Sequence, residues 1–171
     1  MYILGINAYH GDASACLLNA GELIAAAEEE RFLRIKHWAG FPKESIRYCL
    51  EEAGITLSDV GIVAINTDPK ANYFKKIIHV LKHRVNFDLV HDRLRNSQAR
   101  KTILQSLEEA FPATRFRGEI RNVNHHLAHL ASAFYVSPYE KSAIVSVDGF
   151  GDFSSGSWGI GDGSNIVVGG S

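Results

Sequence analysis

Cysteines are few in this sequence, neither charge is in excess, and long apolar runs are absent. The two cysteines among 171 residues, Cys16 and Cys49, lack a Cys-x-x-Cys spacing, which argues against a disulfide framework or a zinc knuckle. The 18 Lys and Arg nearly balance 19 Asp and Glu, so no overall field attracts nucleic acid or an anionic membrane. No apolar run approaches the roughly 20 residues of a membrane span, and the first residues lack the basic start of a secretory signal. We therefore expect a cytoplasmic protein that binds neither nucleic acid nor a membrane.

One segment departs from this charge balance. Residues 70–101 hold nine Lys and Arg against two Asp. Apolar side chains recur there at helical spacing and few aromatic residues lie between them, so we interpret the segment as a solvated helical face. A surface for nucleic acid or another acidic partner is the alternative.

Strand-like and helix-like runs follow one another in a definite order. The expected elements are strands at 2–7, 13–18 and 22–27, a helix at 42–53, a strand at 60–66, two helices within 71–111, a strand at 115–123 and a helix at 124–136. A three-stranded meander followed by alternating strands and helices predicts an α/β fold of the ribonuclease-H-like kind, in which helices flank a mixed sheet.

The same meander starts again after Pro138. Strands are expected at 142–148, at 155–160 and from Asn165 onward, with a turn at 161–163. The pair Gly11-Asp12 recurs as Gly151-Asp152, which favours an internal repeat. We predict two similar lobes, the first at 1–137 and the second at 138–171, with the second truncated after its opening strands.

Two histidines share one face of the predicted helix at 124–136. His125 and His129 are four residues apart, on the side opposite the apolar stripe. Two imidazoles placed in this way supply half of a transition-metal site, and the helix N-terminus beside them favours bound anions. A solvated or partly packed histidine cluster is the alternative, and a third ligand has to come from elsewhere.

The break between the first two predicted strands contains His10 and Asp12. A glycine in such a loop lets backbone N–H groups approach a phosphate or carboxylate, and the ordinary pKa of histidine, near 6.5, suits a general base. Ordinary turn chemistry is the alternative. A similar run at 148–152, with Asp148, Gly149 and Gly151, predicts a second phosphate-binding turn of the kind found in actin-like folds.

The connection at 28–42 mixes both charge signs with three aromatic residues. Four cationic or titratable side chains could bind an anionic group there: Arg31, Arg34, Lys36 and His37. An exposed, charged connection is the alternative.

Four motifs in this order resemble the amino-terminal part of the O-carbamoyltransferases, which include nodulation-factor and tobramycin carbamoyltransferases. They lie at 3–15, 27–37, 123–129 and 146–149. The first domain of that family is similar to the tRNA threonylcarbamoyladenosine synthase subunit and has the bilobal actin-like fold. The carbamoyladenylate-forming domain of the family is absent from these residues, so we expect this chain alone to be inactive.

The resemblance implies a reaction and roles for particular residues. ATP and carbamoyl phosphate would give carbamoyl adenylate, whose carbamoyl group would pass to a hydroxyl of a sugar or an antibiotic-type acceptor. By the resemblance, His10 would be the catalytic histidine, and Lys36 would orient the carbamoyl group. We expect Asp12 to take part in catalysis beside His10, and Arg31 and His37 to bind the substrate together with Lys36. His125 and His129 would bind a divalent metal such as Fe²⁺, with an aspartate beyond residue 171 as third ligand, and the turn at 148–151 would bind phosphate.

Two other functions are compatible with the same fold. One is a small-molecule kinase with the actin-like fold, and the other is a non-catalytic nucleotide-binding module. A kinase has no use for the paired histidines, so binding of Fe²⁺ or Zn²⁺ discriminates between an O-carbamoyltransferase and a kinase. The sequence leaves the oligomeric state open, a homodimer included.

Overall fold

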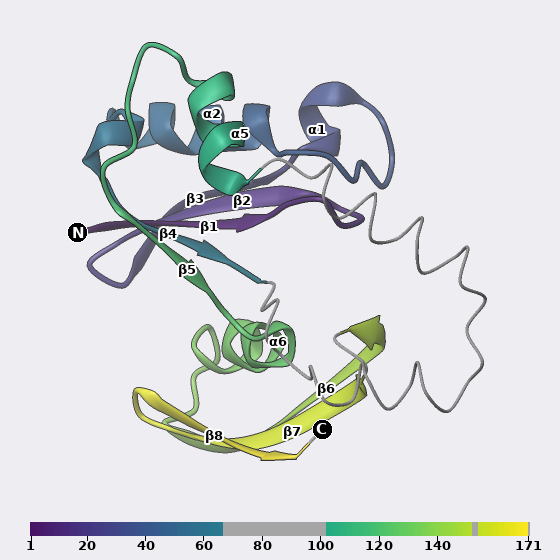
Figure 1. Ribbon diagram of the computed structural model, residues 1–171. Coiled ribbons are helices and arrows are strands. Elements are labelled where there is room, and N and C mark those ends of the chain that lie inside the picture. Colours follow the sequence, from purple (N-terminus) through teal and green to yellow (C-terminus); the bar gives the residue numbers. More distant parts are fainter. Residues whose placement is uncertain (67–101, 152–153, 171) are drawn as a thin grey trace, which may run out of the picture. The chain divides into compact units, whose positions relative to one another are not determined.

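The computed structural model describes residues 1–66, 102–151 and 154–170 (Figure 1). Backbone contacts divide the chain into two compact units. The described part of the first unit comprises residues 1–65 and 102–122, and the second comprises residue 66 and the described residues from 123 onward. Each unit has its own sheet.

The first unit contains a five-stranded mixed sheet in the order β3-β2-β1-β4-β5. Its strands are β1 (Tyr2–Asn7), β2 (Ser14–Asn19), β3 (Glu22–Glu28), β4 (Val60–Ile65) and β5 (Glu119–Asn122). β2 is antiparallel to both β1 and β3, whereas β4 is parallel to β1 and β5 is parallel to β4. An antiparallel meander extended by parallel strands beside its first strand is the topology that the sequence predicts, so the ribonuclease-H-like α/β fold is confirmed.

Helices cover one face of this sheet (Figure 1). They are α1 (Glu30–Leu33), α2 (Lys43–Glu52), a short 3₁₀ helix (Leu57–Asp59) and α5 (Ile103–Ala110). Alternate strand residues such as Leu4, Leu17 and Val63 are buried against helix residues such as Ile46 and Leu107. The core thus lies between the sheet and these helices. Every second strand residue faces it, and so do the helix residues that recur about every 3.6 positions.

The helices of the first unit partly match their predicted positions. The helix predicted at 42–53 is α2, and α5 is part of the region in which two helices are expected. The basic segment 70–101 and the rest of that helical region up to residue 101 lie outside the described residues. The one-turn helix α1 lies in a segment that the sequence predicts to be a loop. In the parts of the chain that the structure covers, no helix has the length and hydrophobicity for a bilayer crossing.

In the described part of the second unit, one helix packs on a three-stranded antiparallel sheet. Helix α6 (His125–Phe134) packs on β6 (Lys141–Gly151), β7 (Ser154–Asp162) and β8 (Asn165–Gly170). Its small core joins Leu130 and Phe134 of the helix to Ile144 of β6. The second meander is therefore confirmed. Because α6 packs on this meander, its contacts group it with β6–β8, and the lobe boundary at residue 138 stays a prediction.

Two details of this meander differ from the predictions. The turn between β7 and β8 lies at residues 163–164 and not at 161–163, because β7 continues through Asp162. Gly161 is a strand residue, and a Cβ atom there would lie 2.5 Å from the ring of Phe134, so glycine permits the packing of α6. β6 also extends to Gly151, so Asp148 and Gly149 belong to a strand and not to the predicted turn.

Candidate active site

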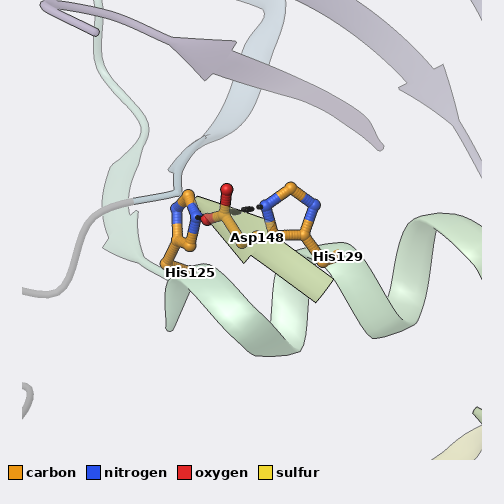
Figure 2. Close-up of side chains that lie close together, drawn as sticks. All are labelled: His125, His129 and Asp148. Carbon is orange, nitrogen blue, oxygen red and sulfur yellow. Dashed lines mark hydrogen bonds and ion pairs between the residues drawn. The ribbon is translucent and has the colours of Figure 1, made fainter. Parts of the chain in front are cut away.

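One candidate site, in the second unit, begins with the N-terminal half of α6. The side chain of Asn124 caps the helix by accepting a hydrogen bond from the Leu127 N–H at 3.0 Å. His125 and His129 follow on adjacent turns of one face, and their Nε2 atoms lie 3.1 Å apart (Figure 2). The i,i+4 spacing in the sequence therefore produces a pair of converging imidazoles.

Asp148 of β6 completes this cluster (Figure 2). Its Oδ2 atom lies 2.6 Å from Nε2 of His125 and 3.7 Å from Nε2 of His129. One ligand atom from each residue lies within 4.8 Å of the other two. His125 and Asp148 are half-buried, whereas His129 is more exposed, so the cluster remains open to solvent on one side.

The separation of the two imidazole nitrogens fits a shared divalent metal ion, whereas the distances from Asp148 Oδ2 to them, 2.6 Å and 3.7 Å, lie below and above the expected range. Two ligands that each lie about 2.1 Å from one ion are about 3.0 Å apart at a right angle and about 3.4 Å apart at the tetrahedral angle. The distance between the two imidazole nitrogens, 3.1 Å, falls in that range. Two imidazoles and one carboxylate also form a donor set that Fe²⁺ and Zn²⁺ accept. The cluster can therefore supply three ligands, where the sequence analysis finds only the two histidines.

The neighbouring His126 is separate from the cluster. It is buried, and its ring meets that of His125 edge-on with centroids 5.5 Å apart. The helical rotation of about 100° per residue explains why adjacent histidines have different surroundings.

A separate candidate site in the first unit is the loop between β1 and β2, which carries His10 and Asp12. The side-chain amide of Asn7 donates hydrogen bonds to the backbone carbonyls of Gly11, at 3.2 Å, and Asp12, at 3.0 Å. Tyr9 and Asp12 have positive φ angles of 62° and 61°, so residues on both sides of His10 have left-handed backbone conformations. The His10 side chain is exposed.

The structure brings together two predicted site residues of the first unit. Nδ1 of His37 lies 2.9 Å from Oδ1 of Asp12, although the two residues are 25 positions apart in the sequence. Lys36 is exposed and forms no ion pair with residues that the structure describes. Arg31 instead pairs with Glu28, at 3.2 Å, and with Glu30, at 3.7 Å. Arg31 is therefore engaged with its own neighbours in the chain.

The predicted phosphate-binding residues lie in β6. Gly149 and Gly151 belong to this strand along with Asp148, and Gly151 pairs with Ser154 of β7. The aspartate that would repeat Asp12, Asp152, lies outside the described residues. Of Asp148, Gly149 and Gly151, the structure describes side-chain contacts for Asp148, which faces the paired histidines.

The sequence does not predict the structural role of Glu29, which lies within the connection at 28–42. Glu29 is 1% exposed, and its carboxylate accepts hydrogen bonds from the backbone N–H groups of Glu44, at 3.0 Å, and Ser45, at 2.8 Å. The Ser45 hydroxyl donates a third, at 2.7 Å. Glu29 therefore caps α2 from a distant segment and ties the connection at 28–42 to the sheet. Its neighbours in the acidic run at 28–30 give no sequence signal that distinguishes it.

A cavity of about 490 Å³ lies next to the two loops of the first unit. Tyr9 and Trp38, the neighbours of His10 and His37, contribute to its wall together with Phe41. The hydroxyl of Tyr9 shares a hydrogen bond with that of Ser106 in α5. The volume falls within the roughly 300–1,000 Å³ typical of small-molecule sites.

Comparisons with known proteins find one matching family and several similar proteins. The family described as carbamoyltransferase N-terminus matches residues 2–170. Nodulation protein NolNO of Sinorhizobium fredii is 36% identical over 161 residues, which cover 94% of this chain and 22% of the relative. The uncharacterized protein sll1178 of Synechocystis is 33% identical over 173 residues, which cover 97% of this chain and 28% of the relative. The chain thus spans about a quarter of the length of these curated relatives.

Solved structures were also compared with the chain. YeaZ from Pseudomonas aeruginosa has a TM-score of 0.48 at 18% identity, over 99% of this chain and 65% of the other. A ROK hexokinase from Thermus thermophilus has a TM-score of 0.47 at 14% identity, over 98% of this chain and 48% of the other.

Proposed function

The chain belongs to the carbamoyltransferase N-terminus family, and from this premise we propose that it carries the transfer site of an O-carbamoyltransferase. The proposed donor is carbamoyl adenylate, made from ATP and carbamoyl phosphate by a domain that these 171 residues do not include. The proposed acceptor is a hydroxyl group of a sugar or an antibiotic-type molecule.

The cluster of His125, His129 and Asp148 is the observation that carries this proposal. A kinase that transfers phosphate with Mg²⁺ prefers oxygen ligands and has no need for two imidazoles. A cluster of two nitrogen ligands and one oxygen ligand suits a borderline cation such as Fe²⁺ instead. These three residues would hold the ion, and Fe²⁺ is the proposed metal. A bound divalent ion would supply positive charge to the phosphate of the leaving AMP.

His10 is the proposed base of the transfer step. The acceptor hydroxyl would give its proton to the imidazole of His10 while the hydroxyl oxygen forms a bond to the carbamoyl carbon. The bond between that carbon and the phosphate oxygen then breaks, and AMP leaves with the electron pair. The exposed position of the His10 side chain leaves room for an acceptor to approach. The exposed ammonium group of Lys36 would orient the carbamoyl oxygen.

Metal analysis of the chain tests the first half of this proposal. We expect purified protein to bind about one Fe²⁺ or Zn²⁺ ion per chain in calorimetric titration. His125→Ala, His129→Ala and Asp148→Ala should each weaken binding at least about tenfold, because each removes one of three ligands. His10→Ala, a histidine substitution in the other unit, is the matched control and should bind as the wild type does. Metal binding that survives all three ligand substitutions would contradict the assignment.

Transfer from synthetic carbamoyl adenylate tests the second half. With glycerol as the hydroxyl probe, the complete protein should release AMP and form carbamoyl glycerol, whereas residues 1–171 alone should not. His10→Asn should lower the rate by about 10²–10⁴-fold, which is the usual contribution of a general base. A His10→Asn variant with wild-type activity would exclude the proposed base.

A further inference from the structure

We infer that His37 is a positioning residue, which holds the loop of His10 in its active conformation through Asp12 and does not itself bind the transferred group. This inference rests on the proposed function, because the loop matters only if His10 takes part in transfer. The sequence predicts a different role for His37, that of binding the substrate together with Lys36. The structure offers four observations that bear on the choice.

The first observation is the use of the His37 ring. Nδ1 faces Oδ1 of Asp12 at 2.9 Å, so this nitrogen carries the proton and donates it to the carboxylate. The side chains of His37 and Asp12 are 79% and 57% exposed. The bond therefore joins two surface loops, and exposed pairs of this kind add little to the stability of a fold. The bond between His37 and Asp12 is therefore better explained by a role in the conformation of the β1–β2 loop than by a role in the stability of the fold.

The second observation is that the same two loops are joined by backbone hydrogen bonds. The Tyr9 N–H donates to the Gly40 carbonyl at 3.1 Å, and the Ala13 N–H donates to the Trp38 carbonyl at 2.9 Å. These bonds lie on either side of His10 and Asp12 in the first loop. The bond between His37 and Asp12 adds a side-chain link between the two loops.

The third observation is the backbone conformation of the linked residues. Tyr9, Asp12 and His37 have φ angles of 62°, 61° and 55°. Residues other than glycine adopt this left-handed region at a cost, and they remain in it only when the surroundings hold them there. Since two of these residues flank His10, release of the loop would move the imidazole of His10.

The fourth observation is that the second loop is itself anchored to the fold. The His37 N–H lies 3.4 Å from the Glu30 carboxylate, and the buried carboxylate of Glu29 fixes the start of α2, which follows this loop. The Glu29 N–H also donates to the Ala13 carbonyl at 2.8 Å. The connection at 28–42 can therefore serve as a fixed support for the more strained β1–β2 loop.

Three substitutions of His37 separate positioning from direct binding. The amide nitrogen of asparagine occupies about the place of Nδ1, and asparagine tolerates positive φ, so His37→Asn keeps the bond to Asp12. Glutamine reaches about the place of Nε2 and loses that bond. Glycine loses it without backbone strain. Positioning predicts that His37→Asn retains most of the transfer rate, whereas His37→Gln and His37→Gly lower kcat about 10- to 100-fold with KM for carbamoyl adenylate unchanged.

Direct binding of the carbamoyl group predicts the reverse order. In that case His37→Gln would retain activity, His37→Asn would lose it, and KM would rise. The reversed order of activities would overturn the inference, and so would a rise in KM. The exposed pair of Lys141 and Asp162, 2.6 Å apart in the second unit, is the matched control. Lys141→Ala should leave kcat and KM unchanged.

A double-mutant cycle tests whether His37 acts through Asp12. Asp12→Gly with His37→Gly should lower kcat no further than the worse single substitution, because either change breaks the same bond. Losses that multiply would show that the two side chains act separately, which contradicts the inference.

Hydrogen exchange supplies a measurement that does not depend on activity. In the 171-residue chain, His37→Gly should speed exchange of the Tyr9 and Ala13 amides, which bond to the second loop, and His37→Asn should not. Unchanged exchange in His37→Gly would refute the positioning role. A complete wild-type protein without transfer activity would refute the proposed function, and the exchange result would still decide whether His37 holds the loop.

Discussion

Glu29 shows how one residue in a charged run can become part of the fold. Three neighbouring glutamates occupy positions 28–30, yet only the carboxylate of Glu29 reaches the first turn of α2. The first N–H groups of a helix have no partner within the helix, and a carboxylate satisfies two of them here. A negative charge also suits the positive end of the helix.

Replacement of Glu29 by glutamine should destabilise the first unit. Glu29→Gln keeps the size of the side chain but replaces a charged acceptor with a neutral one, and hydrogen bonds to charged groups contribute about 1.5–3 kcal/mol each. We expect the free energy of unfolding to fall by about 1–3 kcal/mol in urea titrations. Glu28→Gln, at an exposed ion pair, is the control and should change it by less than about 0.5 kcal/mol. Equal effects of the two substitutions would contradict the capping role.

Because of the buried thiol of Cys49, we expect the stability of the first unit to depend on pH in the alkaline range. Burial, helped by nearby Cys16 and Glu52, raises the pKa of this thiol from 9.0 to about 11. The unfolded chain therefore loses the thiol proton at a lower pH than the folded chain, so stability should fall as pH rises from about 9 to 11. Urea midpoints should decline less steeply over this range in Cys49→Ala than in the wild type. Parallel declines in the two proteins would show that Cys49 does not contribute.

At the scale of single elements, α6 determines the candidate metal centre. Its N-cap, Asn124, directly precedes His125, so the cap and the first ligand share one turn. The direction of the His125 side chain therefore depends on where the helix begins. The packing of Phe134 against Gly161 fixes the other end of the helix on the sheet.

Loss of the Asn124 cap should weaken both the helix and its metal site. Asn124→Ala removes the acceptor for the Leu127 N–H, which lowers the free energy of unfolding by about 1 kcal/mol. Fraying of the first turn should also reduce affinity for Zn²⁺, measured by calorimetry. Asn124→Ser retains a capping oxygen and should resemble the wild type in both measurements. If Asn124→Ala binds Zn²⁺ as tightly as Asn124→Ser, the cap does not position the ligands.

At the scale of the whole molecule, the two units can be observed separately because each contains one of the two tryptophans. Trp38 belongs to the first unit and Trp158 to the second. Single-tryptophan proteins, made by Trp38→Phe or Trp158→Phe, therefore report the unfolding of one unit at a time.

Metal should stabilise the unit that contains its ligands. In Trp38→Phe, Zn²⁺ at about 100 times its Kd should add about 2.7 kcal/mol to the stability reported by Trp158, seen as a rise in Tm. His129→Ala in the same background should abolish that rise. A Trp158 transition that Zn²⁺ leaves unchanged would place the metal elsewhere.

Much of the fold could be predicted from local patterns in the sequence. Alternation in β1 and helical spacing in α2 and α6 depend on neighbouring residues. The strand order and the mixed sheet are therefore confirmed, whereas the sequence does not predict α1 and the helical region up to residue 101 lies outside the described residues. The predicted convergence of His125 and His129 is confirmed for the same reason, since the helical repeat alone brings them together. Errors occur where tertiary contacts override local signals. One example is Gly161, where glycine accommodates Phe134 and does not form a turn.

The sequence by itself determined the order of the elements, the two meanders and the paired histidines, because periodicity and turn chemistry act over a few residues. Only the tertiary structure decided that Asp148 joins His125 across 23 positions and that His37 reaches Asp12 across 25. It also decided which of three adjacent glutamates is buried. These contacts depend on how strands and helices pack, and side-chain spacing along the chain does not encode distances between separate elements.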